Sequence, residues 1–333
     1  MANVTRIPLG YNSAYLIEAS GRRLLVDTGP DFRGAADAIE TALDGNLPDL
    51  VLTTHGHLDH AGLGRHWQER GVPVALGADD LHLVNRPALS DPAELRGFQQ
   101  FIEASGAPPE LQGEMLAGIE QRREWALRAA ANRPHPPPPA DRRWPSGLRY
   151  LSFEPDVLIA ADGPALDGLP ALVLRAPGHT PGNLVVALPE EGWLFSGDQL
   201  LPEITPTPAI QRQPRIFDGA DWRFHSLPAF VASLRRLTDM DFQRCFPGHG
   251  EPFDNVQEVI RTNLDQAEQR AERILAVLRE SGPSTVFGLC EAIYPRAVQR
   301  RAWQIVATVQ GHLDLLEADG RATPVGGLYT ASR

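Results

Sequence analysis

The sequence contains no lysine, so all 31 of its basic side chains are arginines. Without lysine, the chain cannot form a Schiff base with a substrate carbonyl, and it cannot contain the lysine of a phosphate-binding P-loop. Cysteine is also scarce, since Cys245 and Cys290 are the only two in the sequence. Two cysteines cannot build a disulfide framework, and the residues around them give no sign of a reactive thiolate.

Long apolar runs are missing as well. No segment approaches the roughly 20 apolar residues that a membrane-spanning helix needs, and the first residues lack the apolar core of a signal peptide. We therefore expect a cytoplasmic protein without a membrane segment. The 333 residues are 42% hydrophobic and 22% charged, as in an ordinary globular protein. This length suits one large domain, or a large domain with a smaller one.

Negative charge is in surplus, with 42 acidic against 31 basic residues and a net charge of −11. Proteins that bind nucleic acids over a large footprint need a basic face. We therefore do not expect a nucleic acid as the main partner, although a local arginine patch stays open.

Much of the first 252 residues consists of short β-rich segments separated by turns and helical stretches. This alternation predicts a layered α/β or α+β domain. Two of the segments, joined by Ala-Ser-Gly-Arg, predict a hairpin. The expected strands are 13–18, 23–27, 49–54, 72–76, 171–175, 183–188, 193–196 and 244–246, and 32–43 is expected to be helical.

Residues 79–144 interrupt this pattern. Helical periodicity over 92–101 and 109–131 is followed by a proline-rich stretch at 134–139. We expect a helical insertion that ends in a rigid loop and forms part of a pocket wall or a lid.

After residue 252 the pattern becomes mainly helical. Expected helices at 255–280, 286–293 and 302–318, followed by a small hairpin, match a winged-helix pattern. A helical cap with a frayed tail is the alternative. We therefore predict a catalytic domain at 1–252, with the insertion at about 79–144, and a winged-helix-like domain at 253–333.

The strongest chemical signal is the segment Thr-His-Gly-His-Leu-Asp-His, which runs from Thr54 to His60. Imidazole is a good ligand for zinc, iron or manganese, and a carboxylate adds charge and a harder oxygen. His55 and His57 are two positions apart, so in extended chain they point the same way. Asp59 and His60 are adjacent and diverge if a helix begins there. One segment can therefore supply two neighbouring metal ions.

Three further expected strands end in candidate ligands, namely His179, Asp198 and His249. Each lies among glycine or proline, in a loop whose backbone can approach a site closely. If these strand ends share one edge of the core, seven ligands converge there. They are His55, His57, Asp59, His60, His179, Asp198 and His249. That number suits two metal ions, with Asp198 bridging them.

The order His-x-His-x-Asp-His, Gly-His, Gly-Asp, Gly-His resembles the metallo-β-lactamase superfamily over roughly residues 4–252. The resemblance implies an α+β fold, a four-layer αββα sandwich in which two mixed sheets lie face to face between helices. It places His55, His57 and His179 on one metal ion and Asp59, His60 and His249 on the other, with Asp198 between them. It also implies that Asp27 supports a ligand histidine through a hydrogen bond.

Differences between this sequence and particular groups of the superfamily limit the reactions that we expect. True β-lactamases usually have cysteine where Asp198 stands, so antibiotic hydrolysis is not expected. Flavodiiron proteins have glutamate at the position of His57. The combination of a bridging aspartate, Asp198, with His60 is similar to that of glyoxalase II and its relatives, which cleave thioesters. The C-terminal segment resembles the winged-helix extension of lactamase-like hydrolases, a group that includes thioesterases and a ribonuclease subgroup.

We therefore predict a hydrolase that attacks a carbonyl ester, with an acyl thioester favoured and a lactone next. Two divalent ions, zinc before iron or manganese, would lower the pKa of a shared water from 15.7 to about 7 and hold it as a bridging hydroxide. Asp59 would orient this hydroxide and Asp198 would bridge the ions, so both are predicted to be catalytic. A small-molecule ester or thioester is the expected partner.

Three alternatives stay open. A metal-dependent endoribonuclease would use the terminal segment to hold RNA, but residues 253–333 contain nine arginines against ten acidic residues. A single-iron persulfide dioxygenase shares much of the ligand pattern. The terminal segment could also serve to form a homodimer, which is compatible with hydrolysis.

Two sets of residues are candidates for contact with the substrate. The arginines of the insertion could meet a phosphate-bearing carrier such as coenzyme A, or could form a solvated helix face. They are Arg122, Arg123, Arg128, Arg133, Arg142 and Arg143. Residues 200–206 are expected to line the cleft, and Trp222, Phe224 and His225 to close one side of it, although Trp222 and Phe224 fit equally well as core residues and His225 as a surface residue.

Overall fold

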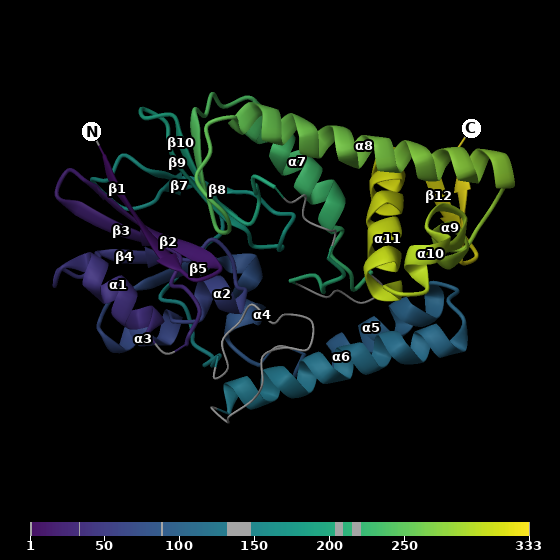
Figure 1. Ribbon diagram of the computed structural model, residues 1–333, viewed down its shortest axis with the longest axis horizontal. Coiled ribbons are helices and arrows are strands. Elements are labelled where there is room, and N and C mark those ends of the chain that lie inside the picture. Colours follow the sequence, from purple (N-terminus) through teal and green to yellow (C-terminus); the bar gives the residue numbers. More distant parts are fainter. Residues whose placement is uncertain are drawn as a thin grey trace.

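The computed structural model describes residues 2–32, 34–87, 89–131, 148–203, 209–214 and 221–332. These residues form two mixed β-sheets that lie face to face (Figure 1) and a small C-terminal hairpin. One sheet has the order β1-β2-β3-β4-β5-β6 and the other β11-β10-β9-β8-β7. The strands are β1 Asn3–Leu9, β2 Asn12–Ala19, β3 Arg22–Val26, β4 Leu50–Leu52, β5 Val74–Gly77, β6 Val157–Ile159, β7 Gly163–Pro164, β8 Leu172–Arg175, β9 Leu184–Leu188, β10 Trp193–Gly197, β11 Arg244–Pro247, β12 Ala322–Val325 and β13 Leu328–Ala331.

Helices cover the outer face of each sheet, which gives the expected four layers (Figure 1). The helices are α1 Ala35–Leu43, α2 Leu58–Ala61, α3 Gly64–Glu69, α4 Leu81–Val84, α5 Pro92–Ala104, α6 Pro109–Ala130, α7 Ser226–Thr238, α8 Val256–Ser281, α9 Val286–Ile293, α10 Pro295–Val298 and α11 Ala302–Ala318, with a 3₁₀ turn η1 at Ala78–Asp80. The α+β sandwich predicted from the sequence is confirmed.

Alternation along the central strands explains the layers. In the antiparallel pair β2–β3, Leu16 and Leu25 join the cluster beneath α1 and α3, whereas Ile17 and Leu24 join the cluster between the sheets. Successive strand residues point to opposite faces, so a strand that is apolar at every position must be covered on both sides.

One helix start and one missed strand differ from the sequence-based expectations for physical reasons. The helix expected at 32–43 begins only at Ala35, because Gly34 adopts a left-handed conformation with φ of 92° at its start. The first strand, β1, was not expected because Pro8 interrupts its pattern. An edge strand tolerates proline, and β1 pairs with β2 alone. Sequence analysis also missed α7, β6 and β7.

The insertion and the C-terminal segment lie against each other. Helices α5 and α6 run below α11 (Figure 1), and the Phe287 amide of α9 donates to the Ser105 carbonyl at 2.8 Å. Helices α8, α9 and α11 and the β12–β13 hairpin form where the winged-helix pattern placed them, with α10 in addition. The winged-helix assignment and the division at residue 252 stay predictions. The proline-rich stretch, Arg133, Arg142, Arg143 and residues 204–206 lie outside the described residues.

Within the described ranges, no helix combines the length and apolarity needed to cross a bilayer.

Cys245 and Cys290 are buried, and burial raises the pKa of each thiol to about 12. Neither cysteine is a thiolate at neutral pH.

Candidate metal centre

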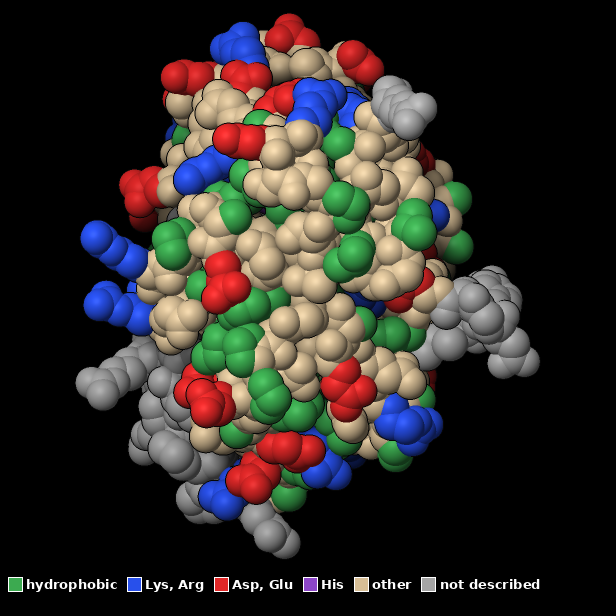
Figure 2. Space-filling view, turned by 90° about the vertical axis from the view of Figure 1, so that its right-hand side faces the viewer, with side chains coloured by type: hydrophobic (Ala, Val, Ile, Leu, Met, Phe, Trp, Pro, Cys, Tyr) green, Lys and Arg blue, Asp and Glu red, His purple; other side chains and the backbone are tan. Residues whose placement is uncertain are grey.

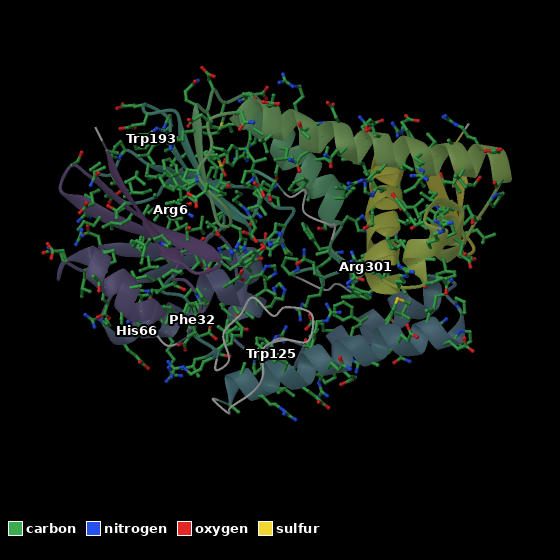
Figure 3. The ribbon with its side chains drawn as sticks, viewed as in Figure 1. Arg6, Phe32, His66, Trp125, Trp193 and Arg301 are labelled. Carbon is green, nitrogen blue, oxygen red and sulfur yellow. The ribbon has the colours of Figure 1, made fainter. Side chains whose placement is uncertain are left out.

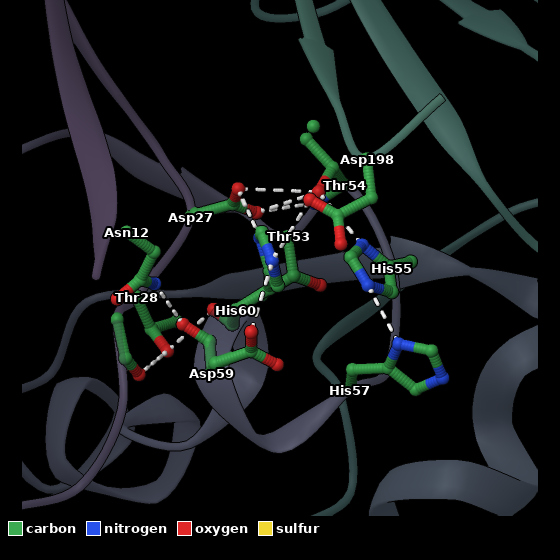
Figure 4. Close-up of polar contacts among 12 residues, drawn as sticks. Asn12, Asp27, Thr28, Thr53, Thr54, His55, His57, Asp59, His60 and Asp198 are labelled. Atoms are coloured by element: carbon green, nitrogen blue, oxygen red, sulfur yellow. Dashed lines mark hydrogen bonds and ion pairs between the residues drawn. The ribbon is translucent and has the colours of Figure 1, made fainter. Parts of the chain in front are cut away.

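Five chain segments meet at one edge of the two sheets and bring the expected ligand residues together. Four of these segments follow β3, β4, β10 and β11, and the fifth joins β8 to β9. Backbone hydrogen bonds tie the segments to one another, as in the donation from the Thr28 amide to the His60 carbonyl at 2.7 Å. Residues from the first three segments appear in Figure 4.

The first group consists of His55, His57 and His179, whose ligand atoms lie within 4.8 Å of one another. Nε2 of His55 is 3.0 Å from Nδ1 of His57, and Nε2 of His179 is 3.1 Å from the same atom. His55 and His57 therefore point the same way, as expected for two positions in an extended loop.

The second group consists of Asp59, His60 and His249, also within 4.8 Å. Oδ2 of Asp59 is 3.5 Å from Nε2 of His60 and 3.3 Å from Nε2 of His249. Asp59 and His60 belong to the short helix α2, so the chain turns immediately after His57 and separates the second group from the first.

Asp198 lies between the two groups. Its Oδ1 is 3.3 Å from Nε2 of His60, and its Oδ2 is 3.4 Å from Nε2 of His249 and 3.5 Å from Nε2 of His179. One carboxylate therefore approaches ligand atoms of both groups.

The cluster has the properties of a site for divalent cations. Nε2 of His60 and Oδ1 of Asp198 are buried and make no hydrogen bond within the described part of the chain. Buried polar atoms without a partner are costly, and a metal ion would satisfy both. Imidazole nitrogens and carboxylate oxygens are also the ligands that zinc, iron and manganese accept.

The protonation states of the histidines and carboxylates in the cluster also favour a bound cation. Burial lowers the pKa of His55 well below its usual value and that of His179 to about 4, so both rings are neutral at pH 7 and able to bind a metal. Burial would raise the pKa of Asp198, but His60 and His249 outweigh it and hold this pKa well below the usual value. Burial alone would lower the pKa of His249, but the carboxylates of Asp198 and Asp59 outweigh burial and raise this pKa to about 9. The ionised carboxylates thus require positive charge, which protons or metal ions can supply.

Asp27, which the family resemblance implied as support for a ligand histidine, contacts His60. Its carboxylate is 2.8 Å from Nδ1 of His60 and accepts hydrogen bonds from the backbone amide of Thr54 at 2.7 Å and from the Thr54 hydroxyl at 2.9 Å (Figure 4). With Nδ1 held in this way, Nε2 of His60 faces the cluster. Asp27 adopts φ of 65°, which is uncommon for a residue with a side chain.

The comparison with known families decides the identity of the fold. The sequence model of the metallo-beta-lactamase superfamily matches residues 7–249, which include every residue of the cluster. The chain belongs to the metallo-β-lactamase superfamily.

Relatives and solved structures of this superfamily resemble the chain over nearly its whole length. A probable metallo-hydrolase of Bacillus subtilis is 28% identical over 326 residues, which is 96% of this chain and 92% of the relative. An atrochrysone carboxyl ACP thioesterase of Aspergillus fumigatus is 22% identical, over 88% of this chain and 71% of its own length. The crystal structure of a metallo-beta-lactamase family protein from Thermus thermophilus is 25% identical, with a TM-score of 0.68, over 99% and 98% of the two chains.

Within this superfamily fold, Asp80 is a site residue that the sequence analysis missed. Its carboxylate accepts hydrogen bonds from the amides of Gly56 at 2.9 Å and Gly182 at 2.6 Å and from the Thr180 hydroxyl at 2.6 Å. It therefore joins the loop of His55 to the loop of His179. Burial raises the pKa of Asp80 to about 6, although the three hydrogen bonds oppose that rise. Asp80 follows β5 at the same sheet edge, so the strand-end argument could have found it.

Two further contacts position the ligand loops. The Gln211 side-chain amide donates to the His179 carbonyl at 3.0 Å, and Nδ1 of His249 is 3.2 Å from the Tyr11 carbonyl. Gly248 allows a close approach at the cluster itself, since a Cβ there would lie 2.6 Å from the His60 ring and 2.7 Å from Oδ1 of Asp198. Nothing larger than glycine fits between these two residues.

Several residues expected around the cleft or in contact with substrate make contacts with other parts of the protein. Trp222 packs against Phe98 with ring centroids 5.0 Å apart, and His225 contacts Asp221 at 3.2 Å. Arg123 pairs with Glu120 on its own helix at 3.3 Å.

Proposed function

We propose that this superfamily member is a hydrolase that uses two divalent metal ions, most readily zinc, to cleave an acyl thioester. The observation that carries the proposal is Asp198, whose two oxygens approach both ligand groups while Oδ1 lacks a hydrogen-bond partner in the described chain. His55, His57 and His179 would hold one ion, and Asp59, His60 and His249 the other.

The residues of the chain prepare the reaction as follows. A pair of divalent ions supplies an acidified water and polarises the substrate carbonyl. Asp59, whose Oδ2 faces His249 at 3.3 Å, would orient the attacking water and hold its proton. Asp27 keeps His60 in one tautomer, with Nδ1 turned away from the cluster. Neither cysteine can serve as the nucleophile, because both thiols are buried and protonated.

Two observations support a thioester over the alternatives. An aspartate, Asp198, stands where lactamases that hydrolyse antibiotics usually have cysteine, and the thioesterase relative matches 88% of this chain. The presence of a complete second group, with Asp59 and His249, favours two ions over the single iron of a dioxygenase. The cytoplasmic location and the homodimer also stay predictions.

The test combines metal analysis with a substrate screen of the full chain. We expect two metal ions per chain by mass spectrometry and hydrolysis of acetyl-CoA or a glutathione thioester, with little turnover of lactones or RNA. Oxygen uptake with a persulfide substrate, or hydrolysis confined to RNA or lactones, would contradict the proposal.

A further inference from the structure

A groove outside the metal centre runs between α6 and the first turn of α11. It consists of a cavity of about 360 Å³ and an adjoining cavity of about 300 Å³. Arg122, Trp303 and Gln304 line both cavities, so the two lie side by side. Arg301 lies near the end of α11 that approaches α6 (Figure 3).

The outer half of the groove concentrates positive charge. Arg122, Arg300 and Arg301 line it together with a single acidic residue, Glu114. Within the described part of the chain, none of the three guanidinium groups has a carboxylate at ion-pair distance. The Arg122 guanidinium lies over the ring of Trp303, 5.3 Å from its centroid, which limits its freedom. In a chain with a net charge of −11, such a group of unneutralised arginines favours an anionic ligand.

The inner half is largely apolar, and one residue of its wall is next to a residue that contacts a ligand loop. Phe98, Ile119 and Ile210 line it. The residue after Ile210 is Gln211, whose side chain donates to the carbonyl of His179 at 3.0 Å. The wall of the inner cavity is thus attached directly to a loop that carries a candidate ligand.

We propose that this groove binds the arm of a phosphopantetheine thioester, with the phosphate on the three arginines and the arm directed along the apolar half toward His179. The inference rests on the proposed thioesterase function and names its substrate class. Guanidinium groups bind phosphate oxygens in pairs of hydrogen bonds, and the methyl and methylene groups of the arm suit a largely apolar wall whose Arg122 and Gln304 offer polar contacts. Coenzyme A and a phosphopantetheinylated carrier protein share this chemistry.

A nucleic acid fits the groove less well. Three arginines neutralise few phosphates, whereas stable nucleic-acid binding needs many such contacts. On the adjoining end of the molecule, acidic and basic side chains are intermixed (Figure 2).

The experiment compares substrates with and without the phosphate. Steady-state constants are measured for acetyl-CoA, for an acetyl-phosphopantetheinyl carrier protein and for acetyl-N-acetylcysteamine, which lacks the phosphate. The Arg300→Gln/Arg301→Gln variant should raise the ratio of the acetyl-CoA KM to the acetyl-N-acetylcysteamine KM about tenfold without lowering kcat, the loss expected for charged hydrogen bonds. Arg122→Gln should act in the same direction. Arg296→Gln, a matched loss of an exposed arginine on α10 outside the groove, should leave the ratio unchanged.

Calorimetry with free coenzyme A separates this inference from the proposed function. Coenzyme A binding that weakens in the double variant supports the groove even if no thioester is hydrolysed, in which case only the proposed function fails. Thioester hydrolysis with an unchanged KM ratio overturns the groove and leaves the proposed function standing. Tighter binding of an oligoribonucleotide than of coenzyme A, lost in the same variant, would also overturn it. A larger effect for the carrier protein than for acetyl-CoA would support the groove and identify the carrier protein as the source.

Discussion

At the scale of single residues, Asp198 has the largest expected effect because it contacts both ligand groups. Asp198→Asn preserves volume but removes the negative charge that a bridge between two cations needs. We expect the variant to lose at least one metal ion per chain and to lower turnover more than about 100-fold, beyond the range seen for supporting residues of metal sites. Metal content and initial rates, measured on the same preparation, check this.

Asp254→Asn is the control for this substitution, because Asp254 is exposed and pairs with Arg244 at 3.3 Å on the surface. It should retain full metal content and rate. Full metal content and activity in Asp198→Asn would remove the central role assigned to this carboxylate.

Asp80 allows a second prediction at this scale. Asp80→Ala leaves three buried donors, from Gly56, Gly182 and Thr180, without their acceptor. We expect the free energy of unfolding to fall on the order of 3 kcal/mol, with weaker metal binding because both ligand loops loosen. Asp79→Asn is a matched neighbour, since Asp79 makes a half-exposed ion pair with Arg175 and should cost less than about 1 kcal/mol. Urea unfolding at pH 7 compares the two, and equal losses would contradict the special role of Asp80.

The residues of the candidate centre were predictable to different degrees. His55, His57, Asp59 and His60 stand out because metal-binding side chains are crowded into one short segment. Asp80 is marked only by its place after an expected strand, because its value comes from contacts such as the one to Gly182, 102 positions away. A single sequence shows which side chains can bind a metal, but it does not show which backbone amides the fold brings to a carboxylate.

At the scale of helices and strands, we expect His312 of α11 to make the stability of the protein depend on pH. The ring is buried, and its Nδ1 is 2.7 Å from the Thr308 carbonyl while Nε2 makes no hydrogen bond in the described chain. Burial lowers the pKa of His312 to about 4, whereas an unfolded histidine titrates near 6.5. The unfolded state therefore binds more protons between these values, and stability is present above pH 6.5 and lost as the pH falls toward 4.

From these values we expect His312 to account for about 2 kcal/mol of the stability lost between pH 7 and pH 5. His312→Phe keeps an aromatic ring without the titration, so its loss over this range should be smaller by that amount. Denaturant unfolding of both proteins at the two pH values measures the difference. The same pH dependence in both would show that His312 is not the group responsible.

Helices and strands were predicted best where one face of the pattern is apolar throughout. The bounds expected for α9 and α11 agree with the structure, and α8 is displaced by one residue at each end. The missed strand β1 contains Pro8, and the missed helix α7 contains Pro228 near its start. Proline breaks the periodic signal at positions where the fold tolerates it, at a sheet edge and in a first helical turn.

At the scale of the whole molecule, one apolar cluster extends across the boundary predicted at residue 252. Leu194 of β10, Phe230 of α7, Ile260 of α8 and Leu316 of α11 all belong to it. The helical layer over the five-stranded sheet is thus buried in turn by the C-terminal segment (Figure 1). The sequence indicated the composition change at this boundary, but not the extent of the surface shared across it, because that surface depends on how α7 and α11 pack.

Removing residues 253–333 tests what this shared surface contributes. The truncated chain would expose the apolar side chains of this cluster that α8 and α11 now cover, including those on α7. Burial of such a side chain stabilises a protein by about 1.5–3 kcal/mol, so exposing three of them approaches the 5–15 kcal/mol by which whole domains are stable. We expect the truncated chain to aggregate or to lose its cooperative thermal transition in circular dichroism, whereas the full chain with the same tag keeps it. If residues 1–252 remain monomeric, unfold cooperatively and bind metal, they form an independent domain, and the C-terminal segment serves the substrate rather than the fold.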